Sequence, residues 1–307
     1  MSLRHGAEGE GDYRAGFVAI AGSPNVGKST LLNRLVGSKV SITSNRPQTT
    51  RQTITGIVTR PRAQIAFLDT PGYQTRHRSA LNRMMNRSVA ATLREANAIL
   101  WIVEALKFEG ADAAVARLLP SEIPVVLAIN KIDLVRDKKR LLPFIEQMAR
   151  KREFAAIVPV SARKEPRVEE LLDALADVLP PGRQMYEEEE ITTANERFLA
   201  GELLREKLFR LLGQELPYAT TVKIDRFEVV DGVRHIHGVV FVDKASQKGI
   251  VIGKSGQKLK EIATQARQDM ERLFDGRVFL EVWVRVKPGW GRTEASLRRV
   301  GYGEPRE

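Results

Sequence analysis

The chain has 307 residues, no cysteine and a formal net charge of +11, so it allows two domains of roughly 150 residues and excludes disulfides and thiolate zinc sites. No apolar run approaches the ~20 residues of a membrane span, and the first residues lack the apolar centre of a signal peptide. We therefore expect a cytoplasmic protein with an anionic partner, either nucleic acid or an acidic membrane face.

A phosphate-binding loop is predicted near the start of the chain. After a polar stretch over 1–15 that we expect to be disordered, residues 17–21 form an apolar run typical of a buried strand. The segment GSPNVGKST then matches G-x-x-x-x-G-K-[ST], and residues 29–36 carry apolar side chains at helical spacing. Backbone N–H groups of such a loop approach phosphate oxygens, a lysine adds positive charge and a serine can hold magnesium. The predicted phosphate-binding residues are Gly22, Asn25, Val26, Gly27, Lys28, Ser29 and Thr30.

A second motif follows a long polar segment over 37–51, which we expect to be an exposed loop. Residues 52–59 and 64–68 predict a pair of strands, and the second ends at Asp69-Thr70-Pro71-Gly72. This D-x-x-G lies at the carboxyl end of a strand, where ligands bind in open α/β sheets. Asp69 can there hold magnesium through water, and the Gly72 N–H can contact a γ-phosphate.

Three more apolar runs, over 98–103, 124–129 and 155–160, are typical of strands buried on both faces of a parallel sheet. The second ends in Asn130-Lys131-Ile132-Asp133, and the Asp133 carboxylate can accept from the ring N–H and the exocyclic amine of guanine. An ordinary turn capped by Asp133 is the alternative. The third precedes Ser161-Ala162, whose backbone can reach the guanine oxygen.

Helical patterns alternate with these strands, which predicts a three-layer α/β domain with a mostly parallel sheet over residues 16–179. The expected helices span 79–96, 111–119, 138–150 and 168–178.

In this order, GSPNVGKS, QTTR, DTPG, NKID and SAR resemble the signature elements of translation-factor-type P-loop GTPases. The resemblance implies hydrolysis of GTP to GDP, with Thr50 as a second magnesium ligand and Thr49 as the alternative by register. Tyr73 stands where related enzymes carry a water-orienting glutamine, unless it is only a surface aromatic. GTPases with a similar GxPNxGKS loop are thought to bind potassium through its asparagine, here Asn25, for which a turn role is the alternative.

The second half begins after a linker over 180–194, which contains Pro180-Pro181-Gly182 and an acidic run over 187–190. One amphipathic helix is expected over 195–212, with strands over 218–229 and 233–242. The apolar side of that helix would carry Phe198, Leu203, Leu204, Leu208, Leu211 and Leu212.

A G-x-x-G loop, Gly253 to Gly256, follows a short apolar segment over 249–252 and precedes a basic helix. With a last strand over 278–286, the order of elements matches an α+β KH domain of type II, whose loop clamps about four nucleotides of single-stranded RNA. We place this domain at 195–287 and a C-terminal tail at 288–307. Trp290 in the tail either stacks on a base or packs against the protein. The predicted RNA-binding residues are Ile252, Gly253, Lys254, Ser255, Gly256 and Lys258.

The combination of these motifs with VIGKSG, RFLAGELLREKL, ELPYATTV and the closing WVRVKPGW resembles the Era family of GTPases. The resemblance implies a monomeric, magnesium-dependent and GTP-switched factor that binds the 3′ region of 16S rRNA and acts in maturation of the 30S ribosomal subunit. It also implies a peripheral presence at the cytoplasmic face of the cell membrane. Two other functions stay open from the residues alone, an RNA-binding scaffold with a structural nucleotide and a membrane-linked signalling GTPase.

Overall fold

A computed structural model describes residues 13–44, 46–73, 79–164, 167–213 and 215–302. The expectation of disorder over 1–15 falls on residues outside these ranges up to position 12, and it is wrong for Arg14 and Ala15, which belong to the first strand. The chain divides into two compact units. The first contains Met1–Val40, Thr53–Thr75 and Ser88–Thr193, and the second contains Ser41–Gln52, Arg76–Arg87 and Ala194–Glu307.

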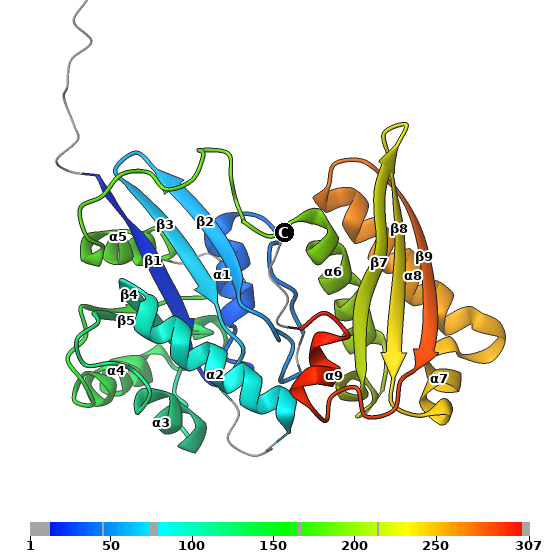
Figure 1. The fold of residues 1–307 in the computed structure, drawn as a ribbon. Helices are drawn as coiled ribbons and strands as arrows, with labels where there is room; N and C mark the ends of the chain where they lie inside the picture. Colours follow the sequence, from blue (N-terminus) through cyan, green and yellow to red (C-terminus); the bar gives the residue numbers. More distant parts are fainter. Residues whose placement is uncertain (1–12, 45, 74–78, 165–166, 214, 303–307) are drawn as a thin grey trace, which may run out of the picture. The chain divides into compact units, whose positions relative to one another are not determined.

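The first unit is built on a six-stranded sheet in the order β2-β3-β1-β4-β5-β6 (Figure 1). Every neighbouring pair is parallel except β2 with β3, so the carboxyl ends of five strands lie at one edge. The strands are β1 Arg14–Ala21, β2 Ile54–Arg60, β3 Ala63–Asp69, β4 Ala98–Glu104, β5 Val125–Asn130 and β6 Ala156–Pro159. The helices are α1 Lys28–Val36, α3 Gly110–Ala116, α4 Leu141–Ala149 and α5 Val168–Val178, with the second half of α2 Ala80–Glu95.

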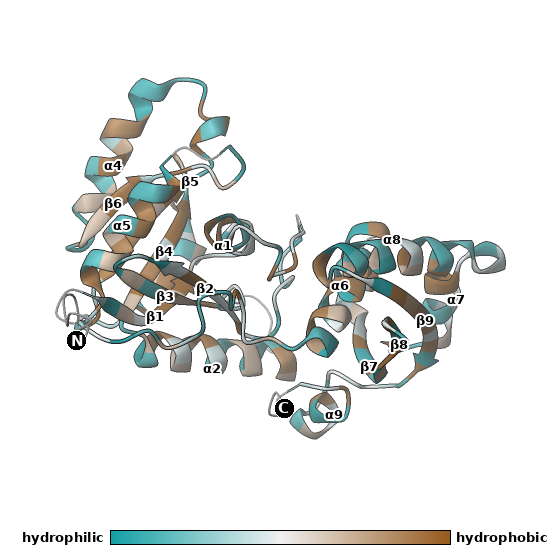
Figure 2. Cartoon of the chain, turned by 90° about the horizontal axis from the view of Figure 1, so that it is seen from above, coloured by the Kyte–Doolittle hydropathy of each residue, from teal (hydrophilic) through white to brown (hydrophobic). Residues whose placement is uncertain are grey.

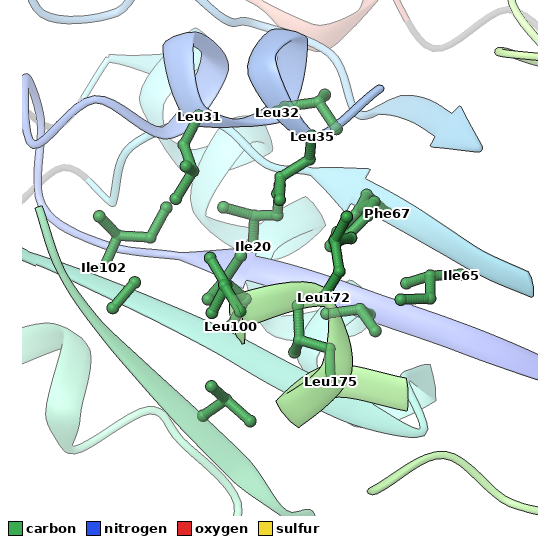
Figure 3. Close-up of a cluster of buried hydrophobic side chains, with 14 of the residues drawn as sticks. Ile20, Leu31, Leu32, Leu35, Ile65, Phe67, Leu100, Ile102, Leu172 and Leu175 are labelled. Carbon is green, nitrogen blue, oxygen red and sulfur yellow. The ribbon is translucent and has the colours of Figure 1, made fainter. Parts of the chain in front are cut away.

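Apolar clusters fill both faces of this sheet, as the continuous apolar runs predict. On one face, leucines of α1 and α5 pack against residues of β1, β3 and β4, among them Ile20, Phe67 and Leu100 (Figure 3). On the other face, α2, α3 and α4 contribute residues such as Val89, Val115 and Met148. The predicted three-layer α/β fold with a mostly parallel sheet is confirmed.

One predicted helix, over 138–150, is interrupted at its start. Lys138–Arg140 form a 3₁₀ turn, whose Asp137 cap accepts from the Lys139 N–H, and the α-helix begins at Leu141. Pro143 lies in the first turn of α4, where its missing N–H breaks no intrahelical hydrogen bond.

The second unit contains a three-stranded sheet in the order β7-β8-β9, with β7 antiparallel and β9 parallel to β8. Helices α6 and α8 lie on one side of these strands (Figure 2) and enclose the core of this unit. This is the predicted KH arrangement. The elements are α6 Glu196–Leu211, β7 Thr220–Val230, β8 Val233–Val242, α7 Ala245–Ile252, α8 Gln257–Leu273, β9 Arg277–Val286 and α9 Glu294–Arg298, with 3₁₀ turns at Leu216–Ala219 and Lys254–Gly256.

Helix α6 is buried on its charged side as well as on its apolar side, which differs from the amphipathic prediction. Glu202 and Arg205 are both buried, and the Arg205 Nε donates to Glu202 Oε1 at 2.8 Å. Burial disfavours the charged guanidinium, but the carboxylates of Glu202 and Glu206 outweigh it and raise the pKa of Arg205. Paired charges of opposite sign let this face lie inside the unit.

The polar segment after α1 is not an exposed loop throughout. Ser41 and Ile42 are 1% and 2% exposed, and Thr50 and Arg51 are 5% and 1% exposed. This segment lies in the second unit, together with the first half of α2. There Leu81 and Met85 of α2 pack with Trp290, whose indole N–H donates to the Ala219 carbonyl at 3.0 Å. Trp290 therefore packs against protein.

Among the described residues, no helix has both the length and the apolarity needed to cross a membrane.

Candidate functional site

The loop after β1 folds around its own lysine. Lys28 is 8% exposed, and its Nζ donates to the carbonyls of Gly22 at 3.1 Å and Ser23 at 3.0 Å. The side chain thus runs back along the loop at the N-terminus of α1, where the helix dipole favours anions. The arrangement concentrates positive potential where a phosphate group would bind.

The loop needs glycine at position 27. Gly27 has a φ of 103°, and a Cβ built there would lie 2.5 Å from the Asn130 Nδ2. Any larger residue would be strained and would displace the amide of Asn130. That amide is important because it donates to the Val26 carbonyl at 2.8 Å and so ties the loop to the end of β5.

Burial lowers the pKa of Lys28 to about 8, while the carboxylates of Asp69 and Asp112 oppose the shift. The charged ammonium is therefore less favoured than in water, because it has lost its hydration. A phosphate placed beside it would restore the pKa and gain from a strong charge-assisted contact.

The D-x-x-G segment meets the same loop. The Ser29 hydroxyl donates to Asp69 Oδ2 at 2.8 Å, and Asp69 is fully buried at the end of β3. A Cβ on Gly72 would lie 3.3 Å from the Lys28 Nζ, so the backbone at Gly72 passes directly beside the lysine. Hydroxyl and carboxylate oxygens are the ligands that magnesium prefers, so the pair Ser29 and Asp69 fits that ion.

Four side chains at the ends of β5 and β6 form hydrogen bonds in the region predicted to bind the base. The Asn130 Oδ1 accepts from the backbone N–H groups of Lys131 at 2.7 Å and Ala162 at 3.0 Å. The Ala162 N–H is therefore taken by the protein itself. Asp133 accepts from the Ser161 hydroxyl at 2.7 Å, which orients its carboxylate. Lys131 Nζ donates to the Asn25 carbonyl at 2.8 Å and also pairs with Glu104.

Tyr73 and Asn25, the two residues that depart from common GTPase loops, both contact other residues of the first unit. Tyr73 is partly buried and packs against the apolar cluster on the α3 and α4 face. Asn25 has an exposed side chain and a φ of 65°, with its carbonyl bound to Lys131. A left-handed asparagine is typical of tight turns.

Thr49 and Thr50, the two candidates for the second magnesium ligand, lie in the second unit. The Thr49 hydroxyl donates to the Arg46 carbonyl at 2.7 Å, and Thr50 is 5% exposed.

The next residue, Arg51, has a structural role that its polar sequence surroundings do not indicate. Its guanidinium donates to the carbonyls of Thr220 at 2.9 Å and Pro217 at 3.3 Å.

The G-x-x-G loop joins α7 to α8. Gly253 has a φ of 73°, and a Cβ there would lie 2.5 Å from the Cβ of Lys258. Ser255 and Gly256 are also left-handed, with φ of 50° and 76°. Lys254 and Ser255 are exposed, whereas Lys258 pairs with Glu261 at 3.0 Å. The loop presents backbone, one lysine and one hydroxyl at the start of a helix, which suits phosphate groups.

Two family models match this chain, one in each half of the sequence. Residues 17–131 match the model of a family described as 50S ribosome-binding GTPase, and residues 215–291 match the KH domain.

Individual relatives cover nearly the whole chain. The chain is 50% identical over 290 residues to the GTPase Era of Nitrosomonas eutropha, which covers 94% of this chain and 98% of the relative. It is 51% identical to the GTPase Era of Chromobacterium violaceum, with the same coverage. Two solved structures superpose with a TM-score of 0.91 at 39% identity, over 95% of this chain and all of theirs. One is an Era variant from Aquifex aeolicus bound to GDP and tetrafluoroaluminate, and the other is Era with MgGDPNP and nucleotides 1506–1542 of 16S ribosomal RNA.

Proposed function

Because the chain belongs to the Era family of GTPases, we propose that it is a ribosome assembly factor that binds the 3′ region of 16S rRNA through its KH domain. It acts as a monomer in the cytoplasm during maturation of the 30S subunit. The observation that carries this proposal is the presence, in one chain, of the Lys28 phosphate loop and the left-handed G-x-x-G loop. The likeness to an Era structure that contains 16S rRNA supports it.

The chain is a GTPase. The phosphates of GTP lie along Gly22 to Thr30, where Lys28 neutralises their charge and the N-terminus of α1 adds backbone donors. Asp133, oriented by Ser161, accepts from the guanine base. Asn130, Lys131 and Ala162 hold the loops of the base site together.

Magnesium fits the oxygens of Ser29 and Asp69, with Thr50 as the further ligand that the family resemblance implies. When bound, it neutralises charge on the transferred phosphoryl group. Gly72 lies beside Lys28 and is placed to sense the γ-phosphate.

Asn25 is the residue that would hold potassium. Its carbonyl is bound to Lys131, so the backbone is held while the amide faces solvent. A monovalent cation there would add positive charge at the phosphates. This matters because Tyr73 packs against the apolar cluster and supplies no water-orienting amide.

Nucleotide and RNA binding are coupled through the segment Ser41–Gln52. Thr50 lies on this segment, and Arg51 binds it to the KH unit through Thr220 and Pro217. A change at Thr50 on GTP binding is therefore transmitted to the unit that carries the G-x-x-G loop, and hydrolysis reverses it.

An RNA-binding assay with a matched glycine pair tests the function. The unmodified chain binds nucleotides 1506–1542 of 16S rRNA in preference to a scrambled RNA of equal length. Gly256→Asp lowers that affinity at least about 10-fold, because it places a carboxylate where the RNA backbone is clamped. Gly232→Asp is the control, since Gly232 has a similar φ of 73° and open surroundings at the β7–β8 turn. Equal loss in both variants, or binding without sequence preference, contradicts the proposal.

A peripheral membrane contact is a second proposed property, located on the first unit. Leu134 and Leu142 are each 64% exposed, and the exposed basic residues between them are Arg136, Lys138, Lys139 and Arg140. Apolar side chains flanked by basic residues favour acidic lipid surfaces. Co-sedimentation with phosphatidylglycerol vesicles should fall in a Leu134→Ser and Leu142→Ser variant, and unchanged co-sedimentation would refute the location.

A further inference from the structure

The outward face of β9 carries two exposed aromatic side chains. Along this strand Val278 and Val284 face the core, whereas Phe279 and Trp283 alternate with them and are 48% and 59% exposed. Strand β9 is an edge strand, because its only partner in the sheet is β8 among the described residues. A large aromatic surface at such a position costs free energy in water unless a partner covers it.

The exposure of Trp283 is not shared by the other tryptophans. Trp101 is 1% exposed in the core of the first unit, and Trp290 is 3% exposed beside the C-terminal helix. Both are explained by packing. Packing does not explain the position of Trp283, because this residue belongs to neither of the two apolar clusters of the second unit.

Two arginines flank the aromatic pair along β9, and Glu228, across the sheet from Phe279, is paired with Arg226. Arg277 and Arg285 lie on the same face of β9, and both are exposed. Lys223 of β7 pairs with Val239, which in turn pairs with Trp283, so all three share one face. The carboxylate of Glu281 on this face pairs with His237 at 3.3 Å. A partner with negative charge and flat apolar rings is complementary to this surface.

The two rings are separated along the strand. Trp283 lies four positions after Phe279 along β9, a separation of about 13 Å. Glu281 with its histidine partner lies in this interval, and Phe279 itself contacts His235 with ring centroids 5.4 Å apart. Such separated platforms suit individual bases better than one continuous apolar protein contact.

The edge strand β9 separates this outward face from the helix that leads to the G-x-x-G loop, because Val251 of α7 packs in the core with Val278 and Val284. Helix α7, which ends at the G-x-x-G loop, packs against β9 and lies beside its carboxyl end (Figures 1 and 2). Trp283 is three residues from that end. An RNA strand clamped at the loop over about four nucleotides would cross the edge of β9 to reach Trp283.

We propose that Trp283, together with Phe279, is a stacking surface for bases of single-stranded RNA next to those clamped by the G-x-x-G loop. This inference rests on the proposed RNA-binding function. It assigns the flanking arginines, Arg277 and Arg285, to the phosphates between the stacked bases. Stacking is tolerant of base identity, so this surface adds affinity and length rather than sequence preference.

Tryptophan emission tests the proposal directly, because Trp283 is exposed while Trp101 and Trp290 are buried. Saturating nucleotides 1506–1542 of 16S rRNA should quench the emission and protect it from acrylamide. Trp283→Phe should lose this signal yet keep most of the affinity. Trp283→Ala should weaken RNA binding by about 5- to 100-fold, the range of one base–aromatic stack.

Val229→Ala is the matched control, since Val229 is a 60% exposed apolar residue on the same sheet. Its RNA affinity should equal that of the unmodified chain. Unchanged RNA affinity in Trp283→Ala, with no protection from acrylamide, overturns the proposal and leaves an apolar protein partner as the occupant. The Gly256→Asp variant measures the contribution of the G-x-x-G loop separately from that of Trp283. Failure of the unmodified chain to bind the RNA overturns the proposed function and this inference with it.

Discussion

Arg51 donates a hydrogen bond from Nη1 to the hydroxyl of Tyr302 at 3.0 Å, although 251 residues separate them in the chain. The same hydroxyl accepts from Thr221 at 3.1 Å. The guanidinium also lies over the rings of Phe209 and Trp290, 5.3 Å and 5.8 Å from their centroids. One buried arginine thus binds the segment that carries Thr50 to the KH helix α6, to the start of β7 and to the C-terminal residues.

Removal of this arginine should destabilise the second unit. Arg51→Ala leaves buried carbonyls of Thr220 and Pro217 without their donor, so we expect a loss of about 2–4 kcal/mol in the free energy of unfolding. Tyr302→Phe should cost about 1 kcal/mol, and the double variant should show a coupling energy of similar size. Urea unfolding in a Trp101→Phe background observes the second unit alone, because Trp283 and Trp290 both lie in it.

Lys260→Ala is the control for this cycle, because Lys260 is exposed on the second unit and its loss should change stability by less than about 0.5 kcal/mol. Strict additivity of Arg51→Ala and Tyr302→Phe would show that the hydrogen bond contributes nothing.

Guanine selection should depend on the charge of Asp133. Asp133→Asn replaces an acceptor of two guanine donors by an amide, so affinity for GDP should fall by about 100-fold or more. The same amide can donate to the second carbonyl of xanthine, so affinity for xanthosine diphosphate should rise. Calorimetry with GDP and with xanthosine diphosphate measures both changes in affinity. A variant that keeps its GDP affinity would contradict the assigned base site.

Nucleotide binding should take up protons in mildly alkaline solution. The pKa of Lys28 is about 8 because of burial, so about half of the free protein carries a neutral amine at pH 8. Phosphate raises the pKa again, so GDP binding should take up about half a proton at pH 8. Below pH 7 the lysine is already charged and makes no such contribution. Titration calorimetry in buffers of different ionisation enthalpy gives the number of protons taken up. Zero uptake at pH 8 would count against Lys28 as the lysine that contacts the phosphates.

Potassium should stimulate hydrolysis through Asn25. Turnover of GTP in potassium buffer should exceed that in sodium buffer, and the ratio should approach one in Asn25→Ala. The Asn25 amide is exposed, so the substitution should leave the GDP affinity close to that of the unmodified chain. A potassium effect that survives in Asn25→Ala would assign the cation to other ligands.

The sequence predicts that the motifs of the candidate nucleotide site come together, because these motifs lie at strand ends. Ser29 and Asp69 each follow a recognisable strand, and parallel strands bring their carboxyl ends to one edge without further information. The motif at Asn130 and Asp133 is predicted for the same reason. What the motif does not reveal is that the Asn130 side chain binds backbone groups of two other loops.

Burial of charged residues is what the sequence does not predict. Arg51 follows two threonines in a polar stretch, and its partners Thr220 and Tyr302 lie 169 and 251 residues away. Hydropathy likewise assigns Glu202 and Arg205 to the solvent side of α6, although both are buried as a pair. Such burial depends on partners that only the folded chain brings together.

The central claim is that the nucleotide state controls RNA binding, and RNA affinity in two nucleotide states tests it most directly. The dissociation constant for nucleotides 1506–1542 of 16S rRNA should be at least about 5-fold lower with a non-hydrolysable GTP analogue than with GDP, the size of a typical coupling between two sites. This difference should disappear in Arg51→Ala, because the segment that carries Thr50 has then lost its attachment to the KH unit. Equal affinities in the two states of the unmodified chain would contradict the account.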